Sequence, residues 1–148
     1  MPVEATEAKG GKMINEMIEV SAGLVFREGR VLITQRRAGD HLGGLWEFPG
    51  GKRHPGESYE DCLRRELMEE LGIEVEVGER FAVVTHDYPE KTVHLEFFLC
   101  RWLRHEPRAI GVADFTWVNC EQLAQYSFPA ADEQLLVKLK DTAALWKE

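Results

Sequence analysis

Apolar side chains gather in two stretches near the start of the chain, with a polar turn between them. Residues 20–26 (VSAGLVF) and 31–35 (VLITQ) are rich in apolar and β-branched side chains, and the turn Arg27-Glu28-Gly29-Arg30 separates them. Two such runs joined by a short turn that contains glycine are typical of a β-hairpin. The sequence therefore predicts a hairpin, with the ordered part of the chain beginning near Glu19.

A glycine-rich segment and a helix follow the hairpin. Residues 37–57 contain six glycines and two prolines, and a loop of this length inside a compact domain usually has a function. Ser58 then favours the start of a helix, with Asp61 as its capping partner, and Gly72 is a typical residue at the end of one. We therefore expect a helix from Ser58 to about Leu71.

The second half of the chain has the pattern of strands closed by a helix. Asp132 to about Trp146 reads as an amphipathic helix, because Leu135, Leu136, Leu139 and Ala143 fall on one stripe. Strands are predicted at residues 73–77, 80–86, 92–103 and 115–118, with a turn at 87–91 and a short helical turn at 121–125. The pattern indicates an α/β fold with a mixed sheet and flanking helices.

The length of 148 residues corresponds to one domain. Residues 1–16 carry no apolar periodicity and include Gly10-Gly11, so we expect a flexible N-terminal tail before a domain that spans residues 17–148. No apolar run approaches the roughly 18 residues of a membrane span. The polar, acidic N-terminus does not resemble a signal peptide, which predicts a cytoplasmic protein without a membrane partner.

The net charge of −8 argues against a protein that holds nucleic acid mainly through its phosphates. An acidic enzyme can still bind a polyanion when metal ions lie between them, although the charge is equally explained by solubility. The three cysteines form no CxxC pair, so they indicate neither a disulfide framework nor a zinc ribbon. We expect no stable nucleic-acid partner, and either a monomer or a homodimer.

Three glutamates are the strongest candidates for chemistry. Glu66, Glu69 and Glu70 lie at i, i+3 and i+4 of the predicted helix and share one face. Neighbouring carboxylates repel one another unless cations neutralise them, and carboxylate oxygens suit Mg²⁺ or Mn²⁺. By themselves these residues would also fit an ordinary solvated acidic face.

The wider segment resembles the Nudix box of the Nudix hydrolase family. That motif is a glycine, five residues, Glu, seven residues, then Arg-Glu-apolar-any-Glu-Glu-any-Gly-apolar. The matching residues here are Gly51, Glu57, Arg65, Glu66, Leu67, Glu69, Glu70, Gly72 and Ile73. The resemblance implies an α/β/α sandwich in a single domain. It also implies a phosphoanhydride hydrolase in which Mg²⁺, or Mn²⁺ in its place, neutralises the phosphates and acidifies water.

The same resemblance implies roles for the residues of the box. Metal ligation falls to Glu66, Glu69 and Glu70 together with the carbonyl of Gly51. Glu66 is the favoured general base, and Glu57 is a weaker contributor to catalysis. Arg65 is interpreted as a structural partner of Glu57 or Glu69.

Beyond the box, two segments resemble the MutT-type branch of the family, which removes oxidised guanine nucleotides. They are LITQRRAGDHLGGLWEFPGGK and FPAADEQLLVKL. The resemblance implies that Arg37 contacts phosphates and that Glu47 lies beside the metal site. Phe128, with Pro129, would shape the base pocket. His41 is also a candidate for substrate binding, because it lies in the expected phosphate loop.

Two positions depart from the pattern of that branch. Asp132 stands where an asparagine commonly reads the base, and a carboxylate cannot donate a hydrogen bond unless it is protonated. Asp132 could accept N–H bonds from 8-oxoguanine or from cytosine, or it could only cap the closing helix. Some relatives also supply a further metal carboxylate after the long strand. The segment PRAIGVADF has no glutamate, so Asp114 or a water molecule could take that role, or the contact could be absent.

The leading hypothesis is a metal-dependent hydrolase of nucleoside triphosphates that releases the monophosphate and pyrophosphate. Its most favoured substrate is of the 8-oxo-dGTP type, as in nucleotide sanitation, with CTP or dCTP as the alternative. A module that reads damaged bases or senses nucleotides, without catalysis, is the competing class. The complete set of box carboxylates argues against that class.

Overall fold

The computed structural model describes residues 16–147. In chain order the elements are β1 (Glu16–Arg27), β2 (Arg30–Gln35), β3 (Trp46–Glu47), β4 (Gly50–Lys52), α1 (Tyr59–Leu71), β5 (Glu74–Tyr88), β6 (Lys91–Arg104), β7 (Asp114–Val118), α2 (Glu133–Asp141) and the 3₁₀ helices η1 (Gln122–Gln125), η2 (Ala130–Asp132) and η3 (Ala143–Trp146). The predicted tail lies outside the described residues except for Glu16, which already belongs to β1.

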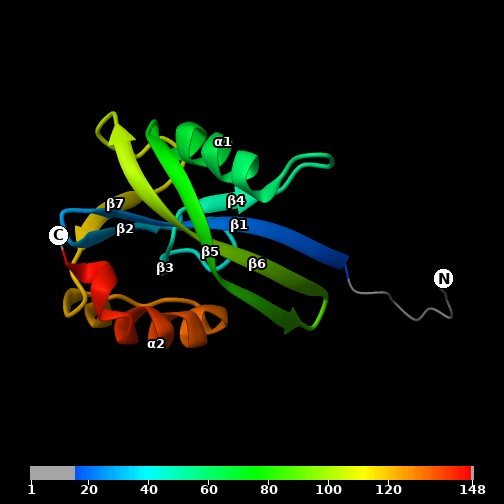
Figure 1. Cartoon of the computed structure of the whole chain (residues 1–148). Coiled ribbons are helices and arrows are strands. Elements are labelled where there is room, and N and C mark those ends of the chain that lie inside the picture. The colour runs from blue at the N-terminus through cyan, green and yellow to red at the C-terminus, as the bar shows by residue number, and fades with distance from the viewer. Residues whose placement is uncertain (1–15, 148) are drawn as a thin grey trace, which may run out of the picture.

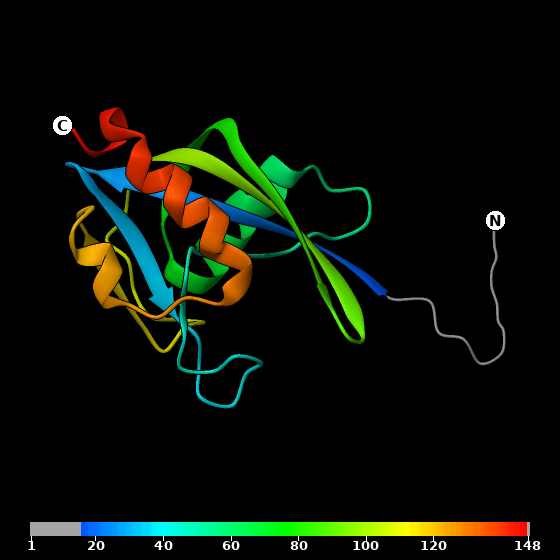
Figure 2. The same ribbon diagram turned by 90° about the horizontal axis from the view of Figure 1, so that it is seen from below.

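The strands form one mixed sheet. Its main order is β3-β2-β1-β6-β5, while β4 pairs with β1 and β7 pairs with β2. β1 and β6 run parallel, and the other pairs are antiparallel. α1 and α2 lie on opposite faces of this sheet (Figure 1), and the view from below shows α2 crossing the strands (Figure 2). The predicted α/β/α sandwich with a mixed sheet is confirmed.

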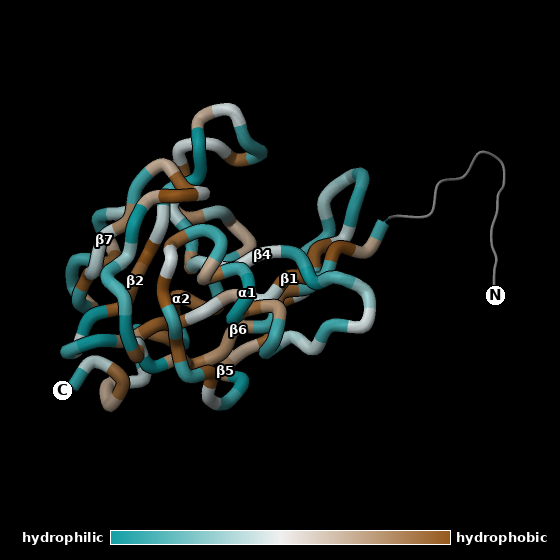
Figure 3. Tube along the Cα trace, turned by 90° about the horizontal axis from the view of Figure 1, so that it is seen from above, coloured by the Kyte–Doolittle hydropathy of each residue, from teal (hydrophilic) through white to brown (hydrophobic). Residues whose placement is uncertain are grey.

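Alternation along the strands divides the interior into two cores. Leu24 and Ile33 belong to the core on the α2 side, with Leu135 and Leu139 of the helix. The adjacent residues point the other way: Val25 and Leu32 pack with Leu63, Leu67 and Leu71 of α1. Hydrophobic positions concentrate on the central strands and the helices, whereas most outer loops are hydrophilic (Figure 3). In residues 16–147 no helix is long and apolar enough to cross a membrane.

The hairpin and the first helix form as local sequence signals predict. Glu28 and Gly29 both have positive φ, which is the backbone of a two-residue hairpin turn. The Ser58 hydroxyl accepts a hydrogen bond from the Asp61 amide at 3.0 Å and caps α1. Gly72 ends the helix with φ of 70°, in the left-handed region.

Other boundaries differ from those predicted. The strands expected at 73–77 and 80–86 are one strand, β5, because bulges between Val77 and Ala82 absorb the irregular residues without breaking its pairing with β6. The segment 37–57 contains β3 and β4, whose pairing partners are distant in the sequence. The closing helix ends at Asp141, and Ala143 is exposed rather than part of the buried stripe.

We predict that Gly72→Ala lowers the free energy of unfolding by roughly 1–2 kcal/mol, because a Cβ is unfavourable in the left-handed region. Urea unfolding followed by circular dichroism measures the change. Gly39→Ala is the matched control, since Gly39 has open space around it and no positive φ. Equal stability of the two variants would contradict the assigned role of Gly72.

Candidate active site

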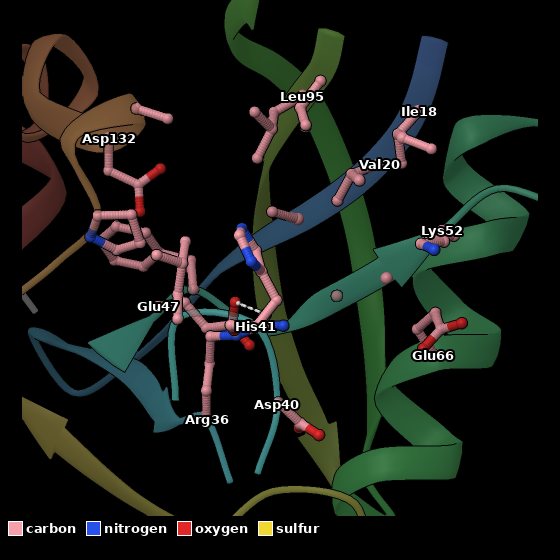
Figure 4. A pocket seen from close by; sticks show the side chains of 18 of the residues that line it. Ile18, Val20, Arg36, Asp40, His41, Glu47, Lys52, Glu66, Leu95 and Asp132 are labelled. Carbon is pink, nitrogen blue, oxygen red and sulfur yellow. Dashed lines mark hydrogen bonds and ion pairs between the residues drawn. The ribbon is translucent and has the colours of Figure 1, made fainter. Parts of the chain in front are cut away.

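A pocket of about 530 Å³ lies between α1, the β1–β6 part of the sheet and the start of α2. Glu66 and Lys52 lie on one side and Asp132 on the other, with apolar side chains of β1 and β6 between them (Figure 4). The polar residues that line it are Arg36, Asp40, His41, Glu47, Lys52, His54, Glu66, Glu70, Tyr88, Lys91 and Asp132. The pocket thus joins an acidic side to an apolar floor and to the carboxyl group of Asp132 on the opposite side.

Glu66 lies directly against the backbone of Gly51. A Cβ on Gly51 would overlap the Glu66 carboxyl group, so only glycine leaves room for this side chain. The side chain of Glu66 is 13% exposed, and burial raises its pKa even though Arg65 donates to it at 2.8 Å. Glu66 and Gly51, both expected to be metal ligands, thus lie against each other.

Glu70 also lines the pocket, and its charge is poorly compensated. Its Oε1 atom is buried and has no hydrogen-bond partner within residues 16–147. Burial raises the pKa of Glu70 to about 8, and the negative charges of Glu66 and Glu47 add to this effect. A buried carboxylate without a partner is costly unless a cation neutralises it. The residues at this side of the pocket therefore fit a divalent metal ion.

Glu69 lies apart from the other two glutamates. Its side chain is 58% exposed, it receives a hydrogen bond from Arg65 at 3.3 Å, and it does not line the pocket formed by the described residues. Within residues 16–147, no three acidic, histidine or cysteine side chains already form a metal-binding group. Glu69 is therefore not brought together with Glu66 and Glu70 in this structure.

Arg65 and Glu57 form a clamp beside the glutamates. Arg65 donates two hydrogen bonds to Glu57, at 2.7 and 3.0 Å, and further bonds to Glu66 and to the carbonyl of Lys52. The two bonds from Arg65 to Glu57, together with one from the His54 amide, lower the pKa of Glu57 to about 2. The interpretation of Arg65 as a structural partner of Glu57 agrees with this geometry. Among the described residues that line the pocket, Glu57 is absent. Both of its carboxylate oxygens accept hydrogen bonds from Arg65.

The structure places Arg36 in the pocket instead of Arg37. Arg36 donates to Glu47 at 2.8 Å, and the pair spans the pocket wall (Figure 4). Glu47 has a pKa raised by burial, despite this partner. Arg37 is exposed and donates to the carbonyl of Ile110 at 2.7 Å. The geometry therefore does not support the expected phosphate contact of Arg37. Arg36, the first residue after β2, is the one that lines the pocket.

His41 reaches the pocket from the tip of its loop. Its ring meets the ring of Tyr88 edge-on, with 5.9 Å between the centroids, so the loop touches the β5–β6 hairpin across the pocket. Tyr88 and Lys91, at the tip of that hairpin, were not predicted from the sequence. Their position depends on the fold of a hairpin whose turn looks like any other surface turn.

Asp132 lines the pocket and is 5% exposed. The reading of Asp132 as only a helix cap is wrong, because its side chain makes no capping hydrogen bond among the described residues. Burial raises its pKa to about 7, and the charge of Glu47 adds to this shift. Asp132 is therefore a nearly buried carboxyl group on the wall of the pocket.

Phe128 does not line the pocket itself but supports a residue that does. Its ring stacks on Phe48 with 5.2 Å between centroids, and it is Phe48 that lines the pocket, with Pro129. Asp114, the possible further metal ligand, accepts a hydrogen bond from the Phe115 amide and lies outside the lining of the described pocket.

The fold and this pocket define a Nudix hydrolase, and comparison with known proteins agrees. The family model described as NUDIX domain matches residues 21–138, so the chain belongs to the Nudix family. It is 40% identical to a CTP pyrophosphohydrolase of Escherichia coli K12 over 126 residues, which cover 82% of this chain and 90% of the relative.

Two further similarities are informative. The chain is 39% identical to an 8-oxo-dGTP diphosphatase of Proteus vulgaris over 95 residues, which cover 64% of this chain and 85% of that protein. The solution structure of the E. coli ORF135 protein superposes with a TM-score of 0.75 at 35% identity, covering 93% of this chain and 96% of that one. The chain is therefore a hydrolase of this family, and a divalent cation is its expected cofactor.

The buried state of Asp132 predicts a pH-dependent stability difference. The folded pKa of about 7 lies above the unfolded value of 3.8, so ionisation penalises the folded state increasingly from about pH 4 to pH 7. Asp132→Asn removes this penalty. Its advantage over the wild type in free energy of unfolding should grow by roughly 2–3 kcal/mol between pH 5 and pH 8.

Urea unfolding of metal-free protein at the two pH values measures this difference. Asp141→Asn is the control, because Asp141 is exposed at the end of α2. An advantage of Asp132→Asn that does not change with pH would show that the Asp132 carboxyl is not buried in solution.

Proposed function

We propose that this chain hydrolyses nucleoside triphosphates to the monophosphate and pyrophosphate with Mg²⁺, for which Mn²⁺ can substitute. The observation that supports this most is the two-sided pocket. Partly buried carboxylates of α1 stand at one side and the buried Asp132 at the other, with apolar residues between them. Such a pocket suits a ligand with a polyanionic end and a heterocyclic end.

The proposed metal ligands are Glu66, Glu69, Glu70 and the carbonyl of Gly51. When bound, Mg²⁺ would neutralise phosphate charge and acidify a water molecule. Glu66 is the proposed general base, since it reaches the pocket beside Gly51 and its pKa is raised. Glu57 is occupied by Arg65 and supports the box rather than exchanging protons.

The side chains around the rest of the pocket orient the substrate in this proposal. Arg36 and His41 are placed to bind the phosphates, and Glu47 holds Arg36 in position. Phe48, supported from behind by Phe128, offers an apolar surface to the base. Asp132 faces the base edge from the start of α2.

An oxidised guanine nucleotide is the leading substrate, because relatives with this fold are named for 8-oxo-dGTP. Guanine offers two adjacent N–H donors, N1–H and N2–H, to an ionised Asp132 carboxylate, which can accept both. A cytosine nucleotide is the second candidate. It is favoured by the relative named for CTP and by the raised pKa of Asp132, since a protonated carboxyl can donate to N3 and accept from the N4 amine.

We expect activity on a nucleoside triphosphate to vanish in EDTA and to return with Mg²⁺ or Mn²⁺. Pyrophosphate should be the first product, and reaction in H₂¹⁸O should place the label in the nucleoside monophosphate. Mass spectrometry of both products checks the point of attack. Full activity in chelator, or orthophosphate as the first product, would refute the proposal.

We expect Asp132→Asn to change the ratio of kcat/KM between 8-oxo-dGTP and dCTP at pH 8.5, because an amide can donate a hydrogen bond to either base whereas an ionised carboxylate can donate to neither. Ionised wild-type Asp132 matches the two guanine donors but is repelled by N3 of cytosine, whereas an amide can donate there. The shift should correspond to roughly 1–3 kcal/mol, the cost of mispairing one buried polar group. The wild-type ratio should also change as the pH falls below 7, where Asp132 becomes protonated.

Steady-state assays of the two nucleotides from pH 6 to pH 9 test this prediction. Asp141→Asn is again the matched control. A selectivity ratio that is the same in wild type and Asp132→Asn at every pH would remove Asp132 from base recognition, while leaving the metal chemistry of the proposal standing.

A further inference from the structure

The end of α1 that carries Glu70 is capped by a distant loop. The last carbonyls of a helix have no partners within it. Here the Glu70 carbonyl accepts hydrogen bonds from the amides of Ile110 at 3.1 Å and Gly111 at 3.0 Å, and the Leu71 carbonyl accepts one from Arg108 at 2.9 Å. The segment 108–112 is thus attached to the turn of the helix that holds Glu70.

The same segment also packs against the side chain of Glu70. A Cβ built on Gly111 would lie 3.1 Å from the Glu70 Cγ atom and 3.3 Å from its Cα atom. The backbone of Gly111 therefore forms a wall beside the stem of this side chain. Glu70 and Gly111 both line the pocket, and the buried Oε1 atom of Glu70 lies without a partner in the described chain.

Arg37 binds the other side of this wall. Its Nη2 atom donates to the Ile110 carbonyl at 2.7 Å. That carbonyl and the Gly111 amide belong to one peptide group, so the group accepts from Arg37 at one end and donates to the Glu70 carbonyl at the other. A charged donor polarises the peptide and strengthens the hydrogen bond that the peptide donates. The Ala113 amide, bonded to the Gln35 carbonyl at 2.9 Å, fixes the segment to β2.

We propose that Arg37 is a positioning residue, which holds Glu70 toward the pocket through the Ile110–Gly111 peptide group and does not contact the phosphates. The proposal rests on the metal-binding role proposed above for Glu70. Arg37 is exposed and outside the pocket lining of residues 16–147, so its influence on the site runs through this peptide. The loop that starts at Arg37 is thereby coupled to the end of α1.

The test is Mn²⁺ binding to the enzyme without nucleotide, measured from the signal of free Mn²⁺ in electron paramagnetic resonance. Arg37→Ala should weaken Mn²⁺ binding roughly 10-fold, the lower end of the range for residues that orient metal ligands. Arg37→Lys, which can still donate to the Ile110 carbonyl, should recover part of the affinity. Gly111→Ala should weaken it as well, because its Cβ would displace the Glu70 side chain.

Two controls make the outcome specific. Arg101→Ala removes an equally charged side chain that pairs with Glu76 on the surface, and it should bind Mn²⁺ as the wild type does. Glu70→Gln should lose Mn²⁺ affinity. If Glu70→Gln binds Mn²⁺ normally, the proposed metal site itself is wrong.

The remaining outcomes concern Arg37. Unchanged Mn²⁺ affinity in Arg37→Ala, with Glu70→Gln impaired, overturns the positioning role alone. If the KM for nucleotide rises at saturating metal in the same variant, Arg37 binds phosphate instead. A loss in Arg37→Ala without a loss in Gly111→Ala overturns the route through this peptide group.

Discussion

The structure depends on keeping carboxylates close together in a partly buried place. Glu66 and Glu70 lie on neighbouring positions of α1, and burial raises the pKa of both. Two features make this arrangement possible. Gly51 leaves space for one carboxyl group, and Arg65 supplies a positive charge that reaches Glu57, Glu66 and the Lys52 carbonyl at once. The clamp of Arg65 and Glu57 joins α1 to β4 and to the loop before the helix. The surrounding fold therefore holds the clustered carboxylates in place.

Features encoded by neighbouring residues could be predicted from the sequence. The cap at Ser58, the end at Gly72 and the positive-φ turn at Glu28-Gly29 each depend on a few adjacent positions. The box itself is also local, because five of its members share one helix. The strand boundaries in β5 were predicted less well, since a bulge is stabilised by the partner strand and leaves a weak trace in the strand's own sequence.

The pocket outside the box could be predicted only in part, because it depends on orientation and distant packing. Arg36 and Arg37 are adjacent and chemically identical, and just after the end of β2 they bond to different partners, so the sequence could not decide between them. Glu69 shares a face with Glu66 and Glu70 by spacing, yet its side chain is exposed and accepts a hydrogen bond from Arg65. Tyr88 enters the pocket only because the long β5–β6 hairpin brings it opposite His41.

The parallel pairing of β1 with β6 bears on how the chain folds. Glu16 lies beside Lys91 and Phe26 beside Arg101, so this central ladder joins residues about 75 positions apart. Contacts over such a separation require closure of a long loop and generally form late in folding. During synthesis on a ribosome, about two-thirds of the chain must be made before β6, the parallel partner of β1, is complete. The floor of the pocket is built from these two strands, so a newly made chain acquires its binding surface only after this long-range pairing has formed.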